Sequence, residues 1–304
     1  MANNYQYGGQ AVIEGVMMRG RSHYAIAVRK DTEEMSVRSE KLGSYTQKHP
    51  VLRLPFIRGV VALAESFVLG LKALQYSANQ FMDTEGEEEL SFWEMALMIL
   101  FALGFTILLF IVLPLFIRGL VGRFLPGVFW RNLTEGLIRA VVLVLYITAV
   151  SYVPDIKRVF AYHGAEHKVI HTYEAGQELT VENARPKTTL HPRCGTSFLL
   201  FVVIVSAIVF SFLGEQTIAM RLLSRILLLP VVAGISYELI KISGKNQSFF
   251  LWRALSWPGL MLQRLTTREP DDSQLEVAIM ALKQVLALEQ NNNLIFPQKD
   301  KMHL

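Results

Sequence analysis

Four apolar segments constrain the fold of this chain more than any other feature of its sequence. They cover residues 92–117, 137–153 (with 133 as an alternative start), 197–213 and 222–242 and contain few charged side chains. A helix that crosses a bilayer needs roughly 20 apolar residues, so 197–213 lies at the lower limit of length. The chain is 52% hydrophobic and only 18% charged, which is unusually apolar for a soluble domain. We therefore predict a mainly α-helical membrane protein with about four transmembrane helices, paired as 92–153 and 197–242.

The distribution of basic residues predicts how these helices are oriented. With four spans, the N-terminal region, the loop 154–196 and the C-terminal region lie on one side of the membrane and carry most of the lysines and arginines. The two loops on the other side carry only a few, namely Arg118, Arg123, Arg131, Arg221 and Arg225. Because Lys and Arg close to a span resist translocation, we expect both termini and the loop 154–196 to face the cytosol.

The regions outside the spans have distinct patterns. Residues 1–50 alternate apolar and polar side chains between turn-forming residues, which predicts a small antiparallel β-meander on the cytosolic side. Residues 51–91 form an apolar helix with interrupting charges and then an acidic turn, which favours an interfacial or re-entrant helix. Residues 243–290 predict an interfacial helix and then an amphipathic helix with a capping box at 273–276. Residues 291–304 are predicted to be a disordered tail.

The loop 154–196 holds four of the seven histidines of the chain, three of them in the segment HGAEHKVIHTYE. If this segment is helical, His163, His167, His171 and Glu174 lie within an arc of roughly 80° on one face. Histidines four residues apart with an adjacent glutamate, here Glu166, form the inverted zincin pattern, in which the histidines bind a metal and the glutamate acts as general base. The alternative is a hydrated polar helix whose histidines make ordinary hydrogen bonds.

A second group of metal-ligand residue types follows in the segment HPRCG. His191 and Cys194 stand three positions apart there, a spacing at which both side chains can reach one ion. We predict that they complete a site for a divalent metal with the histidine helix, and zinc is the expected metal because imidazole and thiolate ligands suit it. For this segment alone, the alternative is a structural turn with a small buried thiol.

Three further charged residues are candidates for lining the same pocket. Glu14 and Arg19 lie in the glycine-bounded segment GGQAVIEGVMMRG, which can pack over the histidine helix; the alternative for Glu14 is an exposed carboxylate. Glu238 lies near the cytosolic end of the last span, where an ionisable group is usually paired or functional. It is therefore expected to be a ligand, a base, or the ion-pair partner of Lys241 or an arginine.

Charge and cysteine content exclude some classes of protein. The formal net charge is +4 and the basic residues are spread along the chain, so no nucleic-acid partner is expected. The single cysteine, Cys194, excludes an intrachain disulfide. Residues 1–9 are polar, so no cleavable signal peptide is expected there.

Four segments, GGQAVIEGVMMRG, HGAEHKVIHTYE, HPRCGTSF and LTTREP, resemble in order the signature segments of the YqhQ-like bacterial integral membrane family. That family is a domain of unknown function, sometimes described as a metal-dependent enzyme. The resemblance runs from about residue 7 to residue 269. It implies a multi-pass protein of the bacterial cytoplasmic membrane, and the matching motif positions are His163, Glu166, His167, His171, Glu174, His191 and Cys194.

Two functions of different class follow from these observations. The first is a metal-dependent hydrolase at the membrane interface, with Glu166 as its catalytic residue. The second is a non-catalytic membrane factor that binds lipid or another membrane complex, such as protein insertion or translocation machinery, and in which the metal site is structural. A transporter ranks third because the predicted spans carry few charges. The lipid bilayer is a partner in every case, and the sequence sets no oligomeric state.

Overall fold

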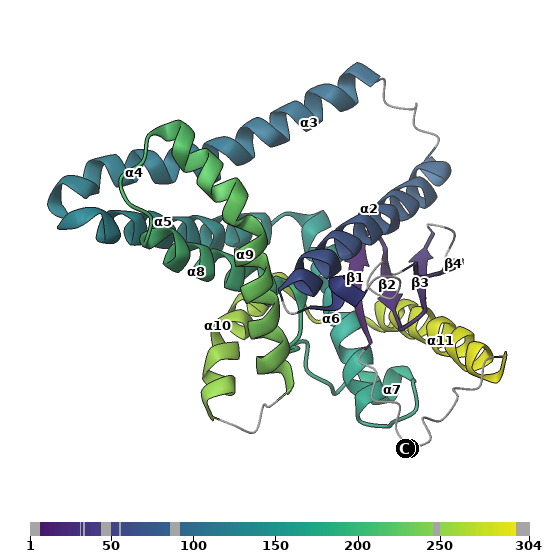
Figure 1. Cartoon of the computed structure of the whole chain (residues 1–304). Coiled ribbons are helices and arrows are strands. Elements are labelled where there is room, and N and C mark those ends of the chain that lie inside the picture. Colours follow the sequence, from purple (N-terminus) through teal and green to yellow (C-terminus); the bar gives the residue numbers. More distant parts are fainter. Residues whose placement is uncertain are drawn as a thin grey trace, which may run out of the picture.

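A four-stranded antiparallel sheet forms the N-terminal part of the protein (Figure 1). The computed structural model describes residues 7–30, 32, 34–43, 50–54, 56–85, 92–245 and 250–295. The strands are β1 (Gly8–Val12), β2 (Gly15–Arg19), β3 (His23–Arg29) and β4 (Met35–Lys41). They pair in sequence order, with Gly8 opposite Arg19 and Arg29 opposite Met35. The predicted β-meander is therefore confirmed.

Helices make up most of the remaining chain that the structure describes. They are α2 (Ile57–Glu85), α3 (Phe92–Ile107), α4 (Leu113–Val121), α5 (Gly127–Val150), α6 (Pro154–Glu174), α7 (Val181–Ala184), α8 (Gly195–Ser211), α9 (Ile218–Lys245), α10 (Phe250–Thr266) and α11 (Asp272–Ile295). A π-helical turn, Leu108–Val112, joins α3 to α4, and short 3₁₀ turns occupy Pro50–Arg53 and Gly122–Phe124. The segment from α3 to α4 is thus one continuous apolar helical rod.

Three helical segments are long and apolar enough to cross a membrane. They are Ala96–Phe124, Gly127–Val150 and Ala219–Ile242. The predicted fourth span corresponds to α8, which is apolar but has 17 residues. It packs against α5 and α9, and Gly136 of α5 approaches Ala207 of α8 so closely that a β-carbon at Gly136 would overlap it. The described residues therefore contain three helices of membrane-spanning length and one shorter apolar helix that packs with two of them.

The second of these helices begins at Gly127, ten residues before the predicted start of its span at residue 137 and six before the alternative start at residue 133. The residues before 137 include Asn132 and Glu135, which make the segment look polar. In the bundle, the Asn132 side-chain amide donates to the carbonyl oxygen of Leu213 at 2.8 Å, and Glu135 is paired with arginines. Polar side chains that find partners inside the protein can extend an apolar helix beyond its hydropathy signal.

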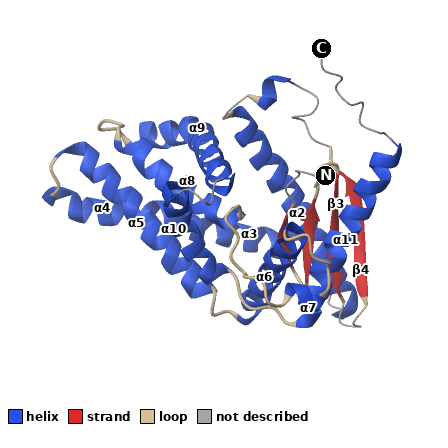
Figure 2. Cartoon of the chain, turned by 90° about the horizontal axis from the view of Figure 1, so that it is seen from below, coloured by secondary structure: helices blue, strands red, loops and turns tan. Residues whose placement is uncertain are grey.

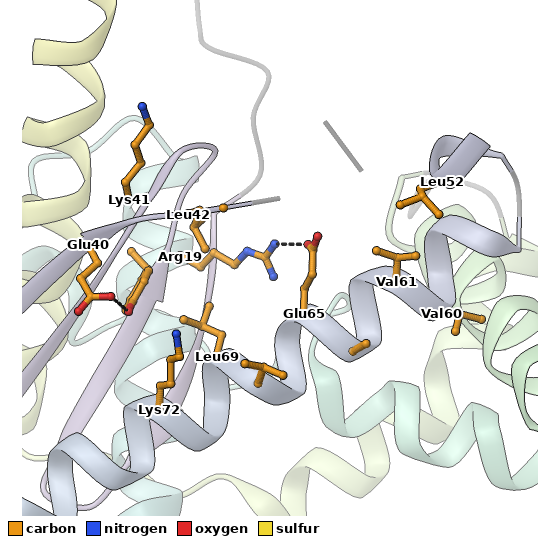
Figure 3. A pocket seen from close by; sticks show the side chains of 14 residues that line it. Arg19, Glu40, Lys41, Leu42, Leu52, Val60, Val61, Glu65, Leu69 and Lys72 are labelled. Atoms are coloured by element: carbon orange, nitrogen blue, oxygen red, sulfur yellow. Dashed lines mark hydrogen bonds and ion pairs between the residues drawn. The ribbon is translucent and has the colours of Figure 1, made fainter. Parts of the chain in front are cut away.

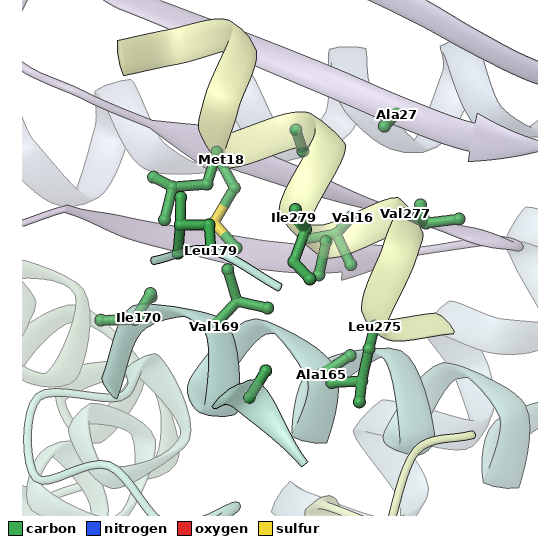
Figure 4. Packing of buried hydrophobic residues seen from close by; sticks show 14 of the residues in the cluster. Val16, Met18, Ala27, Ala165, Val169, Ile170, Leu179, Leu275, Val277 and Ile279 are labelled. Atoms are coloured by element: carbon green, nitrogen blue, oxygen red, sulfur yellow. The ribbon is translucent and has the colours of Figure 1, made fainter. Parts of the chain in front are cut away.

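Helices cover both faces of the sheet (Figures 1 and 2). On one face, Val16, Met18 and Ala27 pack against apolar residues of α6 and α11 (Figure 4). On the other face, Met17 and Ile26 pack against α2. Strands β2 and β3 are consequently buried on both sides, a situation more common in parallel than in antiparallel sheets.

The amphipathic helix α11 docks on the sheet with Leu275, Ile279 and Leu282 buried. Its capping box lies two residues before the predicted one: Asp271 Oδ1 accepts from the Gln274 backbone N–H at 2.9 Å, and Gln274 Oε1 accepts from the Asp271 N–H at 3.2 Å. The predicted pair, Ser273 and Glu276, and the observed pair, Asp271 and Gln274, have the same spacing. Burial of Leu275 in the first turn favours the earlier start of the helix. The helix continues to residue 295, beyond the predicted start of the disordered tail; residues 296–304 lie outside the described residues.

Two helices expose apolar stripes of the kind that interfacial helices require. Helix α2 exposes Leu63, Phe67 and Leu71 on the side away from the sheet, and α10 exposes Phe250 and Trp257. Such stripes are compatible with the predicted interfacial placement. That placement stays a prediction, as do the domain boundaries derived from it, and the predicted acidic turn lies mostly in residues 86–91, outside the described residues.

Candidate metal centre

Four imidazole rings form a row between α6 and the loop that precedes α8. Three belong to α6, which begins with Pro154 at its first turn and runs without interruption to Glu174. The ring centroids of His163 and His167 are 4.4 Å apart, and the His191 ring lies 5.5 Å from that of His167 and 4.8 Å from that of His171. The predicted helical spacing therefore brings the histidines together and adds His191 from the loop.

The first group of candidate ligands comprises His163, His167 and Cys194. One ligand atom from each of these side chains lies within 4.8 Å of the other two. His163 Nδ1 donates to the carbonyl oxygen of Thr266 at 2.8 Å, and His167 Nδ1 donates to that of Thr189 at 2.5 Å. Because a carbonyl oxygen only accepts, each Nδ1 carries a proton, and in the neutral ring the lone pair that can bind a metal is on Nε2. Backbone carbonyls that fix a histidine tautomer in this way are typical around metal ligands.

Cys194 brings its sulfur to this group from the start of α8. It is the N-cap residue of α8, and its Sγ lies 3.1 Å from His163 Nε2. The sulfur also accepts from the backbone N–H of Thr196 at 3.4 Å. A helix N-terminus is a favourable place for a negatively charged ligand. Two imidazole nitrogens and one thiolate form a set that suits zinc and related metals.

The second group comprises His171, Glu174 and His191, whose ligand atoms also lie within 4.8 Å of one another. His171 Nε2 donates to the carbonyl oxygen of Leu190 at 2.8 Å, which leaves Nδ1 as its ligand atom. His191 Nε2 lies 3.6 Å from Glu174 Oε2, and Arg193 forms an ion pair with the same carboxylate. The six predicted ligands therefore form two adjacent groups of three.

In the second group, His191 and Glu174 both have lowered pKa values, for different reasons. Burial lowers the pKa of His191 to about 4, so its ring is neutral and able to bind a metal near neutral pH. Burial acts to raise the pKa of Glu174, but the hydrogen bond with His191 and the charge of Arg193 outweigh it and lower that pKa to about 2. The group thus presents a neutral imidazole beside a carboxylate.

Glu166, the predicted catalytic residue, lies outside both groups. Its side chain is buried between α6 and β1, where its carboxyl group accepts from the backbone N–H of Gly9. Burial raises its pKa to about 7, against the smaller opposing effects of His163 and this hydrogen bond. The carboxyl group therefore titrates in the range suited to proton transfer, but its catalytic role stays a prediction.

Other residues of the signature segments connect the parts of the chain that surround the candidate ligands. Gly164 permits α6 to approach the segment after α10 so closely that a β-carbon there would overlap the carbonyl oxygen of Arg268. Lys168 is buried, and its Nζ donates to Glu269 Oε1 at 2.5 Å and to the Arg185 carbonyl oxygen at 2.7 Å. The LTTREP segment is thus placed to supply the Thr266 carbonyl to His163.

Each of the three predicted pocket residues forms an ion pair in the structure. Glu14 binds Arg158 through both carboxylate oxygens, at 2.6 and 2.5 Å, near the start of α6. Arg19 lies 3.4 Å from Glu65 in a cavity of about 590 Å³ between the sheet and α2 (Figure 3). Glu238 forms a two-point ion pair with Arg58, at 2.7 and 2.5 Å. Its expected pairing with an arginine is confirmed, and the pocket-lining role of the three residues stays a prediction.

One buried residue of the site was missed from the sequence. The Gln263 amide accepts from the His191 backbone N–H and donates to the His191 carbonyl oxygen, both at 2.8 Å, and also donates to Ser197 Oγ at 2.9 Å. These bonds fix the loop that carries His191 and Cys194. The available signal was an uncharged polar residue directly after the apolar run LML, in the segment LMLQRL.

The fold and the site define an α-helical protein of membrane type with clustered candidate metal ligands. The chain belongs to the family described as protein of unknown function (DUF1385), whose model matches residues 54–288. It is 36% identical over 295 residues to the uncharacterized protein YqhQ of Bacillus subtilis (strain 168), with 93% of each chain covered. The family resemblance inferred from the motifs is confirmed. No solved structure matches the chain.

Proposed function

We propose that this protein is a metal-dependent hydrolase embedded in the bacterial cytoplasmic membrane. The observation that carries the proposal is the convergence of His163, His167 and Cys194, with both imidazoles held in the ligand-competent tautomer by backbone carbonyls. Catalytic zinc sites typically have three protein ligands and keep a fourth position for water or substrate, whereas structural sites are closed by four.

The chemistry that such a metal supplies when bound is the acidification of water and the polarisation of a substrate oxygen. The residues of the chain provide the remaining functions. Thr189 and Thr266 orient the two histidines through their carbonyl oxygens. Glu174 and Arg193 form the more exposed edge of the cluster and are the side chains that meet an incoming substrate. Glu166, with its pKa raised to about 7 by burial, is the proposed proton acceptor.

The proposed orientation places this site on the cytosolic side. Both termini and the loop 154–196 lie in the cytosol, α8 acts as the fourth and shortest span, and α2 and α10 lie at the interface. The excess of basic residues in these regions supports this orientation, and the exposed apolar stripes of α2 and α10 support their contact with lipid.

A second candidate function is a non-catalytic membrane factor that binds lipid or another membrane complex. The observation that favours it is that the ligand groups join several parts of the chain: His163 to the end of α10, His167 to the loop before α8, and Cys194 to the start of α8. A metal at such a junction would act as a clamp, and the fold would depend on it.

One set of measurements separates the two functions. Protein purified in detergent is stripped with a chelator and reconstituted with zinc, and the rate of hydrolysis of ester, phosphodiester and peptide substrates is measured beside thermal unfolding. The hydrolase predicts that zinc restores a rate that Glu166→Gln lacks although it retains the metal. If zinc only raises the unfolding temperature and no substrate turns over, the structural role replaces the catalytic one.

A further inference from the structure

A buried carboxylate in the helical bundle is surrounded by four arginines. Glu135 of α5 has a side chain that is only 1% exposed. The four ion pairs join it to Arg139 at 2.5 Å, Arg225 at 2.5 Å, Arg118 at 3.5 Å and Arg221 at 3.8 Å. Four positive charges and one negative charge leave a surplus of three positive charges in this cluster.

Two of the arginines are held firmly by the protein. Arg139 and Arg225 both donate to Glu135 Oε1 at 2.5 Å. Arg139 Nε also donates to the carbonyl oxygen of Phe110 at 3.2 Å, and the guanidinium of Arg225 lies over the ring of Phe210 at 5.6 Å. This inner pair therefore more than compensates the charge of the carboxylate and joins α5 to α9.

The other two arginines, Arg118 and Arg221, have loose contacts with the same carboxylate. They approach only Oε2, and within the described part of the chain Oε2 and Arg118 Nε have no hydrogen-bond partner. Arg118 does donate to Asn132 Oδ1, at a long 3.3 Å. The side chains of all four arginines are equally exposed, at 16–18%, so Arg118 and Arg221 differ from Arg139 and Arg225 by their looser contact with Glu135. Arg118 and Arg221, the outer pair, carry two of the three surplus positive charges.

A surplus of positive charge among apolar helices is costly unless an anion compensates it. Arginine presents several N–H groups in a planar fork, which matches the oxygens of a phosphate group better than lysine does. Glu135 lies in the first half of α5, whose start is the end away from α6 (Figure 1), and none of the cluster residues belongs to either group of candidate metal ligands. The cluster is therefore separate from the candidate metal centre.

We propose that Arg118 and Arg221 form a binding site for a phosphate group, supplied by a lipid headgroup or by free phosphate. The space enclosed within the cluster is only about 10 Å³, which is enough for about one water molecule. The phosphate therefore binds against the outer edges of the two guanidinium groups. Glu135 competes with it for the same arginines and limits its affinity.

The test uses the full chain purified in a neutral detergent. Its thermal unfolding midpoint is measured in sodium phosphate against sodium chloride at equal ionic strength, and in mixed detergent micelles that contain phosphatidylglycerol against mixed micelles that contain diacylglycerol, which has no phosphate. At least one phosphate source is expected to raise the midpoint saturably, by about 3 °C or more. A rise with phosphatidylglycerol alone identifies the lipid headgroup, and a rise with inorganic phosphate identifies the free anion.

Substitutions test whether Arg118 and Arg221 are the residues that bind phosphate. The pair Arg118→Gln and Arg221→Gln is expected to abolish the rise, and the pair Arg118→Lys and Arg221→Lys to weaken binding several-fold because the fork geometry is lost. Arg131→Gln is the matched control, because Arg131 lies at the same end of the bundle but pairs with the exposed Glu215. It is expected to bind as the wild type does.

The Glu135→Gln variant is expected to change phosphate affinity in the opposite direction to the arginine variants. It removes the competing carboxylate, so phosphate is expected to bind at least several-fold more tightly than to the wild type. If the arginines serve only to neutralise Glu135, this variant gains no phosphate response. The proposal is overturned if neither phosphate source raises the wild-type midpoint above its matched control, or if the double glutamine variant responds like the wild type.

Discussion

The Nε2 atom of His163 lies 3.1 Å from the Sγ atom of Cys194, although 31 positions separate the two residues in sequence. His163 belongs to α6, which packs under the sheet, and Cys194 caps the start of α8, which belongs to the apolar bundle. This contact places the candidate metal centre at the junction between the sheet-bearing part and the bundle. Substitutions in the site are therefore expected to lower the stability of both parts.

Gly164→Ala should weaken both the fold and metal binding. The added methyl group would overlap the Arg268 carbonyl oxygen, so α6 and the segment that carries Thr266 must move apart. We expect a loss of about 1–3 kcal/mol in the free energy of unfolding and a lower metal content. Gly195→Ala is the control, because nothing lies within 4 Å of a β-carbon there. Equal effects in the two variants would argue against the close packing.

Arg58 and Glu238 should stabilise the docking of α2 on α9. Their two-point ion pair is only partly exposed, and charge-assisted bonds of this geometry are stronger than ordinary surface pairs. A double-mutant cycle with Arg58→Gln and Glu238→Gln should give a coupling energy of about 1 kcal/mol or more in thermal or denaturant unfolding. A coupling energy near zero would mean that α2 is held by its apolar contacts alone.

Tyr7→Phe should destabilise the contact between the N-terminus and α11. The Tyr7 hydroxyl donates to Glu289 Oε2 at 2.8 Å, and Glu289 is buried. Removing the donor leaves part of a buried carboxylate unsatisfied, at a cost of about 1–3 kcal/mol. Tyr152→Phe, at an exposed tyrosine, should change the free energy of unfolding by less than about 0.5 kcal/mol.

Glu166→Gln should make the metal-free protein more stable than the wild type as the pH rises. The folded-state pKa of Glu166 is about 7, against the usual 4.5, so the folded state binds more protons between these values and wild-type stability falls as pH increases through this window. Glutamine does not titrate, so the difference should grow from pH 4.5 to pH 7 by on the order of 3 kcal/mol and then level off. Denaturant unfolding across this range measures it, and parallel curves would contradict the burial of the carboxyl group.

The sequence predicted the residues of the candidate metal centre, but not their division into two ligand groups. The four-residue histidine spacing placed His163, His167 and His171 on one face, and the structure agrees. The division into two ligand groups depends on the turn that carries His191 and Cys194. That turn is fixed by Gln263, which is 72 positions away from His191, and a local pattern carries no information about such a contact.

The sequence also missed how charges gather in the bundle. Arg118, Arg221 and Arg225 were counted only as loop charges in the orientation argument, yet they converge with Arg139 on Glu135. An ionisable pair four residues apart within an apolar segment was the signal, because such residues need partners. Which partners they find depends on how α4, α5 and α9 pack, and hydropathy does not specify that.

The most direct test of the candidate metal centre is the metal content of the protein after it has been supplied with zinc and purified in detergent. Elemental mass spectrometry should find at least about one metal ion per folded wild-type chain, and His167→Ala and Cys194→Ala should lose most of it. Glu14→Gln, whose side chain lies outside both ligand groups, should retain it. A wild-type chain that is folded and contains no metal, or a His167→Ala variant that binds as much as the wild type, would contradict the candidate metal centre.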